Sequence, residues 1–406
     1  MLVFYFSTIA NSHGGVQSLI LNIARYMSSI GKKVKILDKK DGYIFINANK
    51  ENLNFEFIDI EDDDVSKNID RNDTLISFGH FERDLKFFKQ KKIRVLYWSV
   101  FPDEAINFFK IRTSLNSNSF SNKNIFSKYY TKKFLRLLDN KKALATMELS
   151  HVNVIKNFSA DFEKINYTIV PVPIFINRNS IRNKRIFEDR FSIAYIGRDE
   201  IWKIQPFAKL VEDLLTIDNN APIFIHLYSN NSKSYMNFLN QKKIDFKEKI
   251  SIICHEGYDS FQLSNHMLEH VDVLFAMGTS ILEGTKNGIP TVILDPSYDS
   301  MPNDYKYRWL FEEEGYSLGL PLWLIPNRKG NTLNDVFYDV ENKYTELADK
   351  CYNYTETNHS IESVMKKLLE AVSKTDLLLE DLNWMGKYFT LKRKIFSLIG
   401  KLFKKK

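Results

Sequence analysis

Short apolar segments typical of buried strands alternate with helical patterns along this chain of 406 residues, and glycines stand between the first strand and the first helix. The apolar run at 1–6 breaks at residues 11–15. Apolar residues then recur at three- and four-residue intervals through 16–27, which predicts a helix. Another apolar run follows at 34–37. A strand, a helix and a second strand in this order predict a βαβ unit, and such units build parallel sheets.

The alternation runs through two blocks, which a proline-containing segment and a basic linker separate at 169–185. Further strands are predicted at 74–78, 94–98, 191–196, 223–228, 250–254, 271–275 and 291–294, with helices at 81–90 and 204–215. Because 406 residues exceed one ordinary core, we expect two domains, 1–175 and 186–375, and a tail at 376–406. Two such α/β domains leave a cleft between them, where ligands tend to bind.

Several classes of protein are disfavoured by patterns that the sequence lacks. Two cysteines, Cys254 and Cys351, are too few for a disulfide scaffold or a cysteine-rich zinc site and indicate a reducing, cytosolic compartment. No run of 18 apolar residues occurs, so no membrane-spanning helix is expected. The G-x-S-x-G and G-x-x-x-x-G-K-[ST] patterns are absent, which counts against serine hydrolases and P-loop nucleotide hydrolases.

Two adjacent glycines, Gly14 and Gly15, precede the first predicted helix. Glycine lets a ligand approach the backbone closely, and the start of a helix offers N–H groups with partial positive charge. The pair is therefore a candidate anion site. The alternative is a tight turn in which Asn11 or Ser12 caps the helix.

Two cations, Arg198 and Lys203, follow Gly197 at the end of a predicted strand. Arginine binds phosphate oxygens through paired N–H groups and lysine adds a mobile charge, so together they could hold a diphosphate without a metal. The alternative is a solvated loop in which Asp199 and Glu200 neutralise both cations.

A third candidate site lies at 278–290, where a strand turns at Gly278 into a short helix. The backbone N–H groups of Thr279 and Ser280 could face a phosphate, and Glu283 could accept hydrogen bonds from ribose hydroxyls. Ser280-x-x-Glu283 also matches a capping box, in which the glutamate only satisfies a backbone N–H group. Capping is the favoured interpretation of this segment taken alone.

Histidines give two weaker candidates. His80 follows a predicted strand, at the edge of a parallel sheet where functional loops gather, and could act as a general base. His266 and His270 lie one helical turn apart and could bind zinc, but no H-E-x-x-H pattern or cysteine partner accompanies them. Solvated helix positions are the favoured interpretation, and no metal site is predicted.

The net charge of +7 comes from the C-terminal segment 384–406, which holds eight basic residues and no acidic one and leaves −1 for the rest. Apolar residues recur there at helical spacing, with cations on the other side. Such an amphipathic helix is predicted to lie on an anionic membrane surface, favoured by about 1 kcal/mol per cation. Packing against the N-terminal half is the alternative. Nucleic-acid binding is not expected, because the excess charge is confined to one helix.

Taken in order, these segments resemble the GT-B glycosyltransferases, specifically the family 4-like group of bacterial surface-polysaccharide enzymes. The segments that carry the resemblance are Gly14-Gly15, Gly197-Arg198 with Lys203 (a G-R-x-x-x-x-K element), and residues 280–290 (S-x-x-E-x-x-x-x-G-x-P). The resemblance implies an α/β fold of two Rossmann-like, doubly wound parallel-sheet domains that face a cleft.

The resemblance also implies roles for the candidate residues. It places the donor diphosphate against Arg198, Lys203, Gly278, Thr279 and Ser280. Glu283 would bind the donor ribose, and Gly14 and Gly15 the phosphate or the acceptor. No divalent metal or other cofactor is implied, because these cations and the helix dipole would stabilise the departing nucleotide diphosphate.

The function implied is transfer of a sugar, usually with retention, from a nucleoside-diphosphate sugar to a lipid-linked glycan acceptor in capsule, O-antigen or lipopolysaccharide assembly. The enzyme would lie on the inner face of the cell membrane, held peripherally through residues 384–406. Two departures motivate an alternative: Phe275 replaces an earlier family glutamate, and 97–102 lack the usual catalytic histidine. The alternative is an inactive homologue that acts as a membrane-associated structural partner in glycan assembly. A nucleoside-diphosphate-sugar epimerase is a third possible function.

Overall fold

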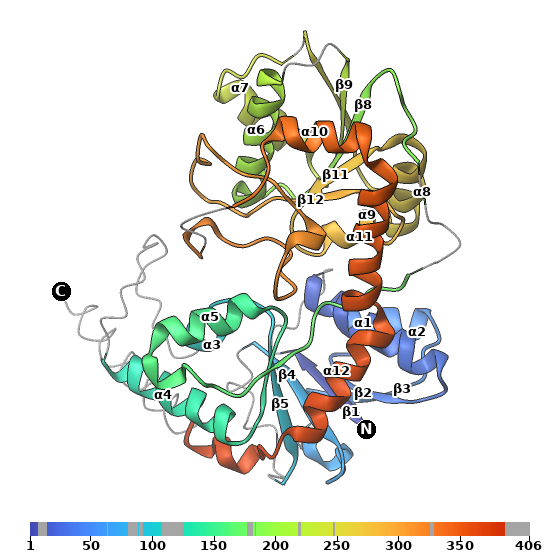
Figure 1. Cartoon of the computed structure of the whole chain (residues 1–406). Coiled ribbons are helices and arrows are strands. Elements are labelled where there is room, and N and C mark those ends of the chain that lie inside the picture. The colour runs from blue at the N-terminus through green and yellow to red at the C-terminus, as the bar shows by residue number, and fades with distance from the viewer. Residues whose placement is uncertain are drawn as a thin grey trace, which may run out of the picture. The chain divides into compact units, whose positions relative to one another are not determined.

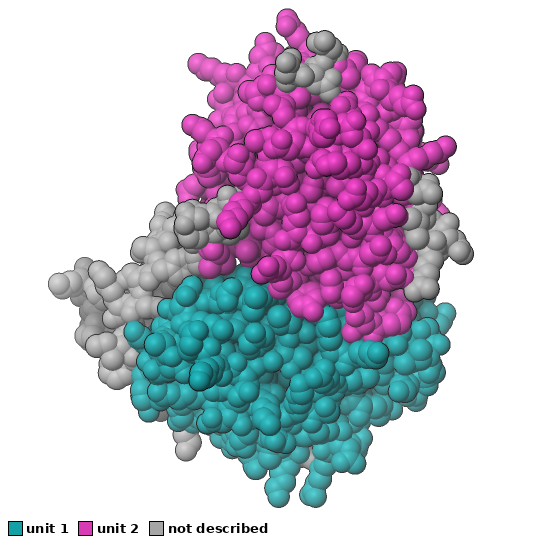
Figure 2. All heavy atoms as spheres, in the orientation of Figure 1, with its two compact units in different colours: residues 1–173, 364–406 teal, residues 174–363 magenta. Residues whose placement is uncertain are grey.

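Both ends of the sequence contribute to one folded unit, and the middle of the sequence forms a second (Figure 2). Unit 1 comprises Met1–Pro173 and Val364–Lys406, and unit 2 comprises Ile174–Ser363. The computed structural model describes residues 1–6, 14–62, 64–79, 88, 92–107, 125–176, 182, 184–217, 221–246, 248–324 and 329–385.

A seven-stranded sheet with parallel pairing throughout forms the centre of unit 1, in the order β3-β2-β1-β4-β5-β6-β7. Its strands are β1 (Leu2–Phe6), β2 (Val34–Asp38), β3 (Phe55–Asp59), β4 (Thr74–Phe78), β5 (Arg94–Ser99), β6 (Leu144–Thr146) and β7 (Thr168–Ile169). The central strands are continuous apolar runs because helices cover both faces of a parallel sheet. Val3 and Leu75, paired across β1 and β4, are fully buried.

Helices flank this sheet, with α1 and α2 on one side and α4 and α5 on the other (Figure 1). The helices are α1 (Gly15–Ser29), α2 (Tyr43–Lys50), α3 (Glu104–Asn107), α4 (Ile125–Asn140), α5 (Leu149–Phe158) and α12 (Ile361–Lys374), which begins in unit 2. The apolar stripe predicted in α1 is buried, including Leu19, Ile20 and Ile23.

The chain re-enters unit 1 at Val364 within α12, and the segment after α12 bonds to the first residues of β5. The Val95 N–H group donates to the Leu377 carbonyl oxygen at 2.8 Å, and the Leu379 N–H group donates to that of Ile93 at 3.0 Å. The Thr375 hydroxyl donates to the Val95 carbonyl oxygen at 2.7 Å. These bonds join segments that lie about 280 residues apart in sequence.

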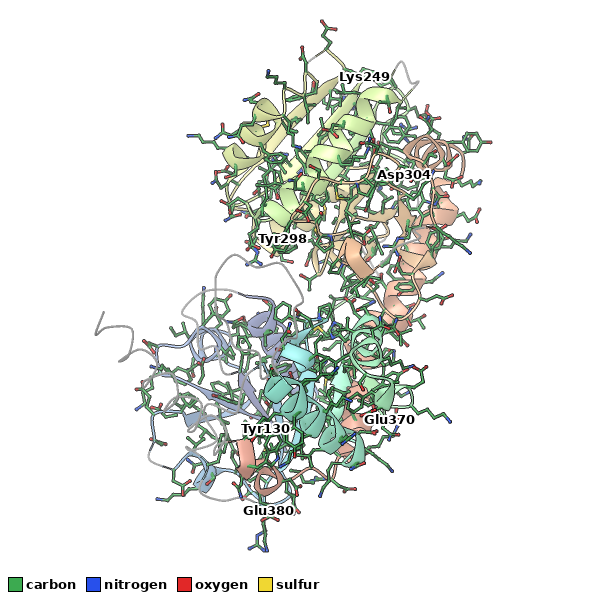
Figure 3. The ribbon with its side chains drawn as sticks, turned by 90° about the vertical axis from the view of Figure 1, so that its left-hand side faces the viewer. Tyr130, Lys249, Tyr298, Asp304, Glu370 and Glu380 are labelled. Atoms are coloured by element: carbon green, nitrogen blue, oxygen red, sulfur yellow. The ribbon has the colours of Figure 1, made fainter. Side chains whose placement is uncertain are left out.

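Aromatic packing holds the same returning segment on α4. The rings of Tyr130 and Trp384 stack with centroids 5.8 Å apart, and the Lys133 ammonium lies 4.4 Å from the Trp384 ring centroid. Figure 3 shows Tyr130 beside the short helix η7 (Leu379–Leu382), which carries Glu380.

A six-stranded sheet forms the centre of unit 2, in the order β10-β9-β8-β11-β12-β13. Its strands are β8 (Phe191–Ile196), β9 (Ile223–Tyr228), β10 (Ile250–His255), β11 (Val273–Ala276), β12 (Thr291–Ile293) and β13 (Arg308–Trp309). All are parallel except β13, which runs antiparallel to β12 at the edge.

Figure 1 shows α6 and α7 on one side of the unit 2 sheet and α8 on the other. The helices are α6 (Ile201–Thr216), α7 (Ser232–Gln241), α8 (Ser260–His270), α9 (Ser280–Thr285), α10 (Leu333–Asn342) and α11 (Tyr344–His359). One core of fully buried side chains, among them Phe207, Leu210 and Ile225, joins α6 to the sheet.

The predicted α/β class and the two parallel-sheet units are confirmed. The predicted strands all form, within two residues at each end, and the helix expected at 204–215 extends over α6. The domain limits differ in two respects. The break falls after Pro173, and residues 364–375, expected in the second domain, belong to unit 1, where the Thr375 hydroxyl donates to the Val95 carbonyl oxygen of β5.

Two predictions fall outside the described residues. These are the helix at 81–90, of which only Phe88 is described, and the amphipathic helix in the tail, where the described part ends at Met385. Among the described residues, none of the helices combines the length and the apolar character needed to cross a membrane.

Candidate functional site

The strand order of unit 2 reverses direction between β8 and β11. These neighbours are parallel, with Ile196 paired to Ala276 at their carboxyl ends. In open α/β sheets the crevice at such a reversal is the usual ligand site, because the two following loops diverge to opposite faces. Gly197–Lys203 follows β8 and Gly278–Ser280 follows β11, so the topology brings two of the three sequence candidates to one place.

Tight packing at Gly197 fixes the loop after β8. A Cβ atom on Gly197 would lie 2.4 Å from the Tyr235 hydroxyl oxygen and 2.8 Å from the Tyr195 ring, so only glycine fits. The Tyr235 hydroxyl donates to the Arg198 carbonyl oxygen at 2.7 Å, and the Tyr195 hydroxyl donates to that of Lys203 at 2.6 Å. Two buried tyrosines thus hold the backbone that carries both candidate cations.

Lys203 lies in the first turn of α6 and is only 8% exposed. Its ammonium lies 5.1 Å from the Trp202 ring centroid, and no carboxylate among the described residues forms an ion pair with it. Burial, aided by the charge of Arg198, lowers the pKa of Lys203 to about 8. A buried lysine at the positive end of a helix is electrostatically unfavourable, which makes it a candidate for binding an anion.

The Arg198 side chain, by contrast, is 61% exposed, with its guanidinium 3.3 Å from a carboxylate oxygen of Glu200. Asp199 is engaged elsewhere, accepting from the side-chain amides of Asn230 and Asn231. The predicted neutralisation therefore applies in part: Glu200 pairs with Arg198, while Lys203 has no such partner within the described residues.

The loop after β11 is left-handed at Gly278, where φ is +63°. This conformation suits glycine, which carries no Cβ. Thr279 occupies the N-cap position of α9 without a side-chain cap, and both it and Gly278 are exposed. The Ser280 side chain makes no capping bond to Glu283, so the capping-box interpretation is wrong.

Glu283 instead faces Lys286 and the first turn of α8. One carboxylate oxygen accepts from the Lys286 ammonium at 2.6 Å and from the Ser260 hydroxyl at 3.1 Å. The carboxylate is partly exposed and remains accessible to a further donor. Its geometry is compatible with binding a hydroxyl-rich ligand.

The glycine pair of unit 1 lies at the start of α1. Gly14 is the N-cap residue in extended conformation and α1 has no side-chain cap; Gly15 is exposed, and a Cβ there would meet nothing within 4 Å. Residues 7–13 lie outside the described part of the chain, as does His80.

Unit 1 also holds a buried carboxyl group that no sequence pattern indicates. Glu104, at the start of α3, follows β5 and accepts from the Val100 N–H group at 2.8 Å. Burial raises the pKa of its carboxyl group to about 7. Glu104 stands beside Asp103 in a short segment after β5, and no sequence pattern indicates that its carboxyl group is buried.

The histidines of unit 2 also depart from expectation. His266 is partly buried and hydrogen-bonds through Nδ1 with the Tyr228 hydroxyl at 2.7 Å, so the prediction of a solvated position is wrong for this residue. Nδ1 of His226 lies 3.0 Å from Nε2 of His255, and the three imidazoles form one cluster. The partners come from β9 and β10, so the three imidazoles belong to three separate elements.

No protein-family model matches the chain, and no curated protein is similar to it in sequence. Solved structures, however, match almost its full length. HepE of Anabaena, in complex with UDP, has a TM-score of 0.56 at 12% identity, covering 92% of this chain and 99% of that chain. WaaB, a lipopolysaccharide outer core galactosyltransferase, has a TM-score of 0.52 at 12% identity with the same coverage.

S. aureus TarM, solved with UDP and α-GlcNAc-glycerol, has a TM-score of 0.53 at 11% identity, covering 91% of this chain and 99% of that chain. At such identities the similarity concerns the arrangement of strands and helices, not individual side chains. The two sheets, each reversing direction after its first strand, agree with that arrangement. The chain therefore has the GT-B glycosyltransferase fold.

Proposed function

We propose that this chain is a glycosyltransferase that uses a nucleoside-diphosphate sugar as its donor. The observation that carries the proposal is Lys203, a buried cation without an acidic partner in the described residues, placed with Arg198 at the sheet reversal of unit 2. Support comes from the solved structures of the same fold, of which HepE and TarM were determined with UDP.

In the proposed complex Lys203 and Arg198 bind the donor diphosphate, with the loop Gly278–Ser280 beside it. Glu283 would accept hydrogen bonds from the ribose hydroxyls. As the glycosidic bond breaks, negative charge grows on the leaving diphosphate, and fixed cations stabilise that charge more than the bound substrate. This would allow leaving-group departure without a metal ion.

The acceptor side is proposed to involve Gly14 and Gly15 of unit 1, with His80 as general base. We further propose a lipid-linked glycan acceptor in capsule, O-antigen or lipopolysaccharide assembly, and peripheral attachment to the inner face of the cell membrane through 384–406. The basic tail and the lipopolysaccharide role in the name of WaaB support this part of the proposal.

Donor binding can be tested by thermal unfolding of the full chain with UDP, GDP, CMP and their sugars. We expect a rise in melting temperature that is selective for one base, because a ligand that binds only the folded state stabilises it. Lys203→Met and Arg198→Ala should each markedly reduce the rise, whereas Lys233→Met, a matched change of an exposed lysine on α7, should leave it intact.

Turnover of the selected donor sugar, measured by nucleotide release with a lipid-linked acceptor, then distinguishes an enzyme from an inactive homologue. Binding without release would favour the structural-partner alternative. A folded protein that binds none of these nucleotides at millimolar concentration would contradict the proposed function.

A further inference from the structure

Three imidazoles from separate elements converge beneath α8 in unit 2. His226 lies on β9, His255 ends β10 and His266 lies on α8, and one ligating atom from each falls within 4.8 Å of the others. The strand register explains the first two. Ile253 pairs with His226, and His255 pairs with Tyr228. His255 is therefore two residues further along its strand than the partner of His226, which puts both histidines on the same face of the sheet.

The geometry within the cluster resembles a set of metal ligands more than a set of charged groups. Nδ1 of His226 and Nε2 of His255 stand 3.0 Å apart, with nearly parallel rings. The rings of His255 and His266 have centroids 4.5 Å apart. No carboxylate among the described residues lies within ion-pair distance of these three rings, and only the charge of Glu269, acting on His266, favours an imidazolium ion.

Neutral imidazoles are the form that a metal requires. Burial and mutual repulsion lower the pKa of His226 to about 3 and of His255 to about 4, and burial also lowers that of His266. Each ring therefore offers a lone pair at neutral pH. The free energy of metal binding would then offset the free energy lost by burying three polar rings together.

One further contact would orient a ligand ring. The Tyr228 hydroxyl can accept from Nδ1–H of His266 at 2.7 Å, which leaves the lone pair of Nε2 available for ligation. Such a bond to the second ring nitrogen fixes the tautomer and orientation of a metal-binding histidine. A hollow of about 510 Å³, lined in part by Tyr258 and Glu269, reaches the cluster at His266, whereas His226 and His255 do not line it.

We propose that His226, His255 and His266 bind a divalent transition-metal ion, with zinc as the representative. Zinc–nitrogen bonds of about 2.0–2.1 Å place the nitrogens of a tetrahedral site about 3.4 Å apart. The cluster reaches this geometry if its widest separation closes by about 1.4 Å, a change that side-chain rotation supplies. Water from the hollow would complete the coordination.

The proposed site joins α8 to the edge of the sheet. Its role is structural, since the ligands span β9, β10 and α8 and come from none of the loops assigned to the diphosphate. The same helix begins at Ser260, which bonds to Glu283. A bound ion would therefore also hold the element that contacts the proposed ribose ligand.

The test uses the tag-free full chain after chelator treatment, titrated with Zn²⁺ by calorimetry and with Co²⁺ by visible absorption. We expect saturation at one ion per chain and a tetrahedral cobalt spectrum. His255→Gln and His266→Gln should each weaken binding about a hundredfold or more, beyond what loss of an outer-shell contact costs. Thermal unfolding without metal shows that these variants fold.

His270→Gln is the neighbouring-histidine control, because the His270 ring contacts that of His266, with centroids 4.3 Å apart, but His270 is outside the three-histidine set. Binding should survive this change. Loss of binding in His270→Gln would assign the ion to His266 and His270 of α8 and overturn the proposal. So would absence of saturable binding in the wild type, or undiminished affinity in the His255→Gln, His266→Gln double variant.

Discussion

A buried ammonium group is destabilising unless a ligand or a carboxylate supplies negative charge, and for Lys203 the charge of Glu200 offsets burial only in part. Its pKa of about 8 has a consequence for binding. Below pH 8 the side chain is charged and attracts a diphosphate, and above pH 8 it loses its proton. We expect UDP affinity to be steady up to about pH 7.5 and to fall by up to about tenfold per pH unit above 8.

Calorimetric titration of UDP between pH 6.5 and 9 checks this expectation, provided that UDP is the nucleotide that binds. Lys203→Met should bind more weakly at pH 7 and lose the fall above pH 8, while Lys233→Met should follow the wild type. An equal slope in Lys203→Met would assign the titration to another group.

Glu104 gives a second prediction at the residue scale, on stability. Its pKa is raised to about 7, so the folded state holds the proton over a range where the unfolded chain has released it. Stability is then lost as pH rises from about 4.5 through 7. Glu104→Gln should be neutral at pH 4.5 and should stabilise the protein by about 2 kcal/mol at pH 8, after allowance for partial exposure.

Urea unfolding of both proteins at pH 4.5 and pH 8 measures the difference. Glu163→Gln, which alters an exposed carboxylate of unit 1, serves as the control and should show little change at either pH. A Glu104→Gln variant equal in stability to the wild type at pH 8 would count against the raised pKa.

Among the strands and helices, sequence patterns predicted the secondary structure of those segments whose own composition determines it. Strands β1, β4, β8 and β9 are continuous apolar runs and were predicted closely, because burial on both faces demands such runs. Three of the four edge strands, β3, β7 and β13, were missed, whereas the edge strand β10 was predicted. Strand β13 has two residues, and β3 mixes charged with apolar side chains on a partly exposed edge.

The candidate site follows the same logic. Gly197, Arg198 and Lys203 stand together in sequence and were predictable as a group, although the burial of Lys203 was not. The histidine cluster could not be found, because His226 and His255 lie 29 residues apart and meet only through the register of β9 and β10. Tertiary pairing of this kind leaves no local pattern.

The returning segment gives a prediction at the element scale. Leu377 is fully buried in unit 1 and its carbonyl oxygen accepts from β5. Leu377→Ala should destabilise unit 1 by about 2–4 kcal/mol, because the deletion leaves a cavity. Leu369→Ala, an exposed position on α12, should cost little. Chemical denaturation checks both, and equal stability of the two variants would show that the segment is not integral to unit 1.

For the whole molecule, the segregation of charge predicts how the chain meets a membrane. Reversing Lys401, Lys404, Lys405 and Lys406 to glutamate removes attraction worth about 1 kcal/mol per cation. Vesicle flotation should show at least about a tenfold loss of binding to anionic lipid, with neutral vesicles binding neither protein. Reversal of four lysines in unit 2 (Lys233, Lys242, Lys243 and Lys306) is the charge-matched control, and equal losses in both proteins would indicate a general effect of net charge.

Because unit 1 is formed from both ends of the chain, it also affects the order in which the protein folds during synthesis on the ribosome. Unit 2 is entirely synthesised once residue 363 has emerged, whereas the first residues of β5, already paired with β4, gain their bonds to the returning segment some 280 residues later. At about 5–20 residues per second, that interval lasts roughly 15 to 55 s. The N-terminal part of the chain is therefore made first and finished last. During that interval the Val95 N–H group and the Ile93 carbonyl oxygen lack these partners, which leaves the start of β5 open to chaperones and to aggregation.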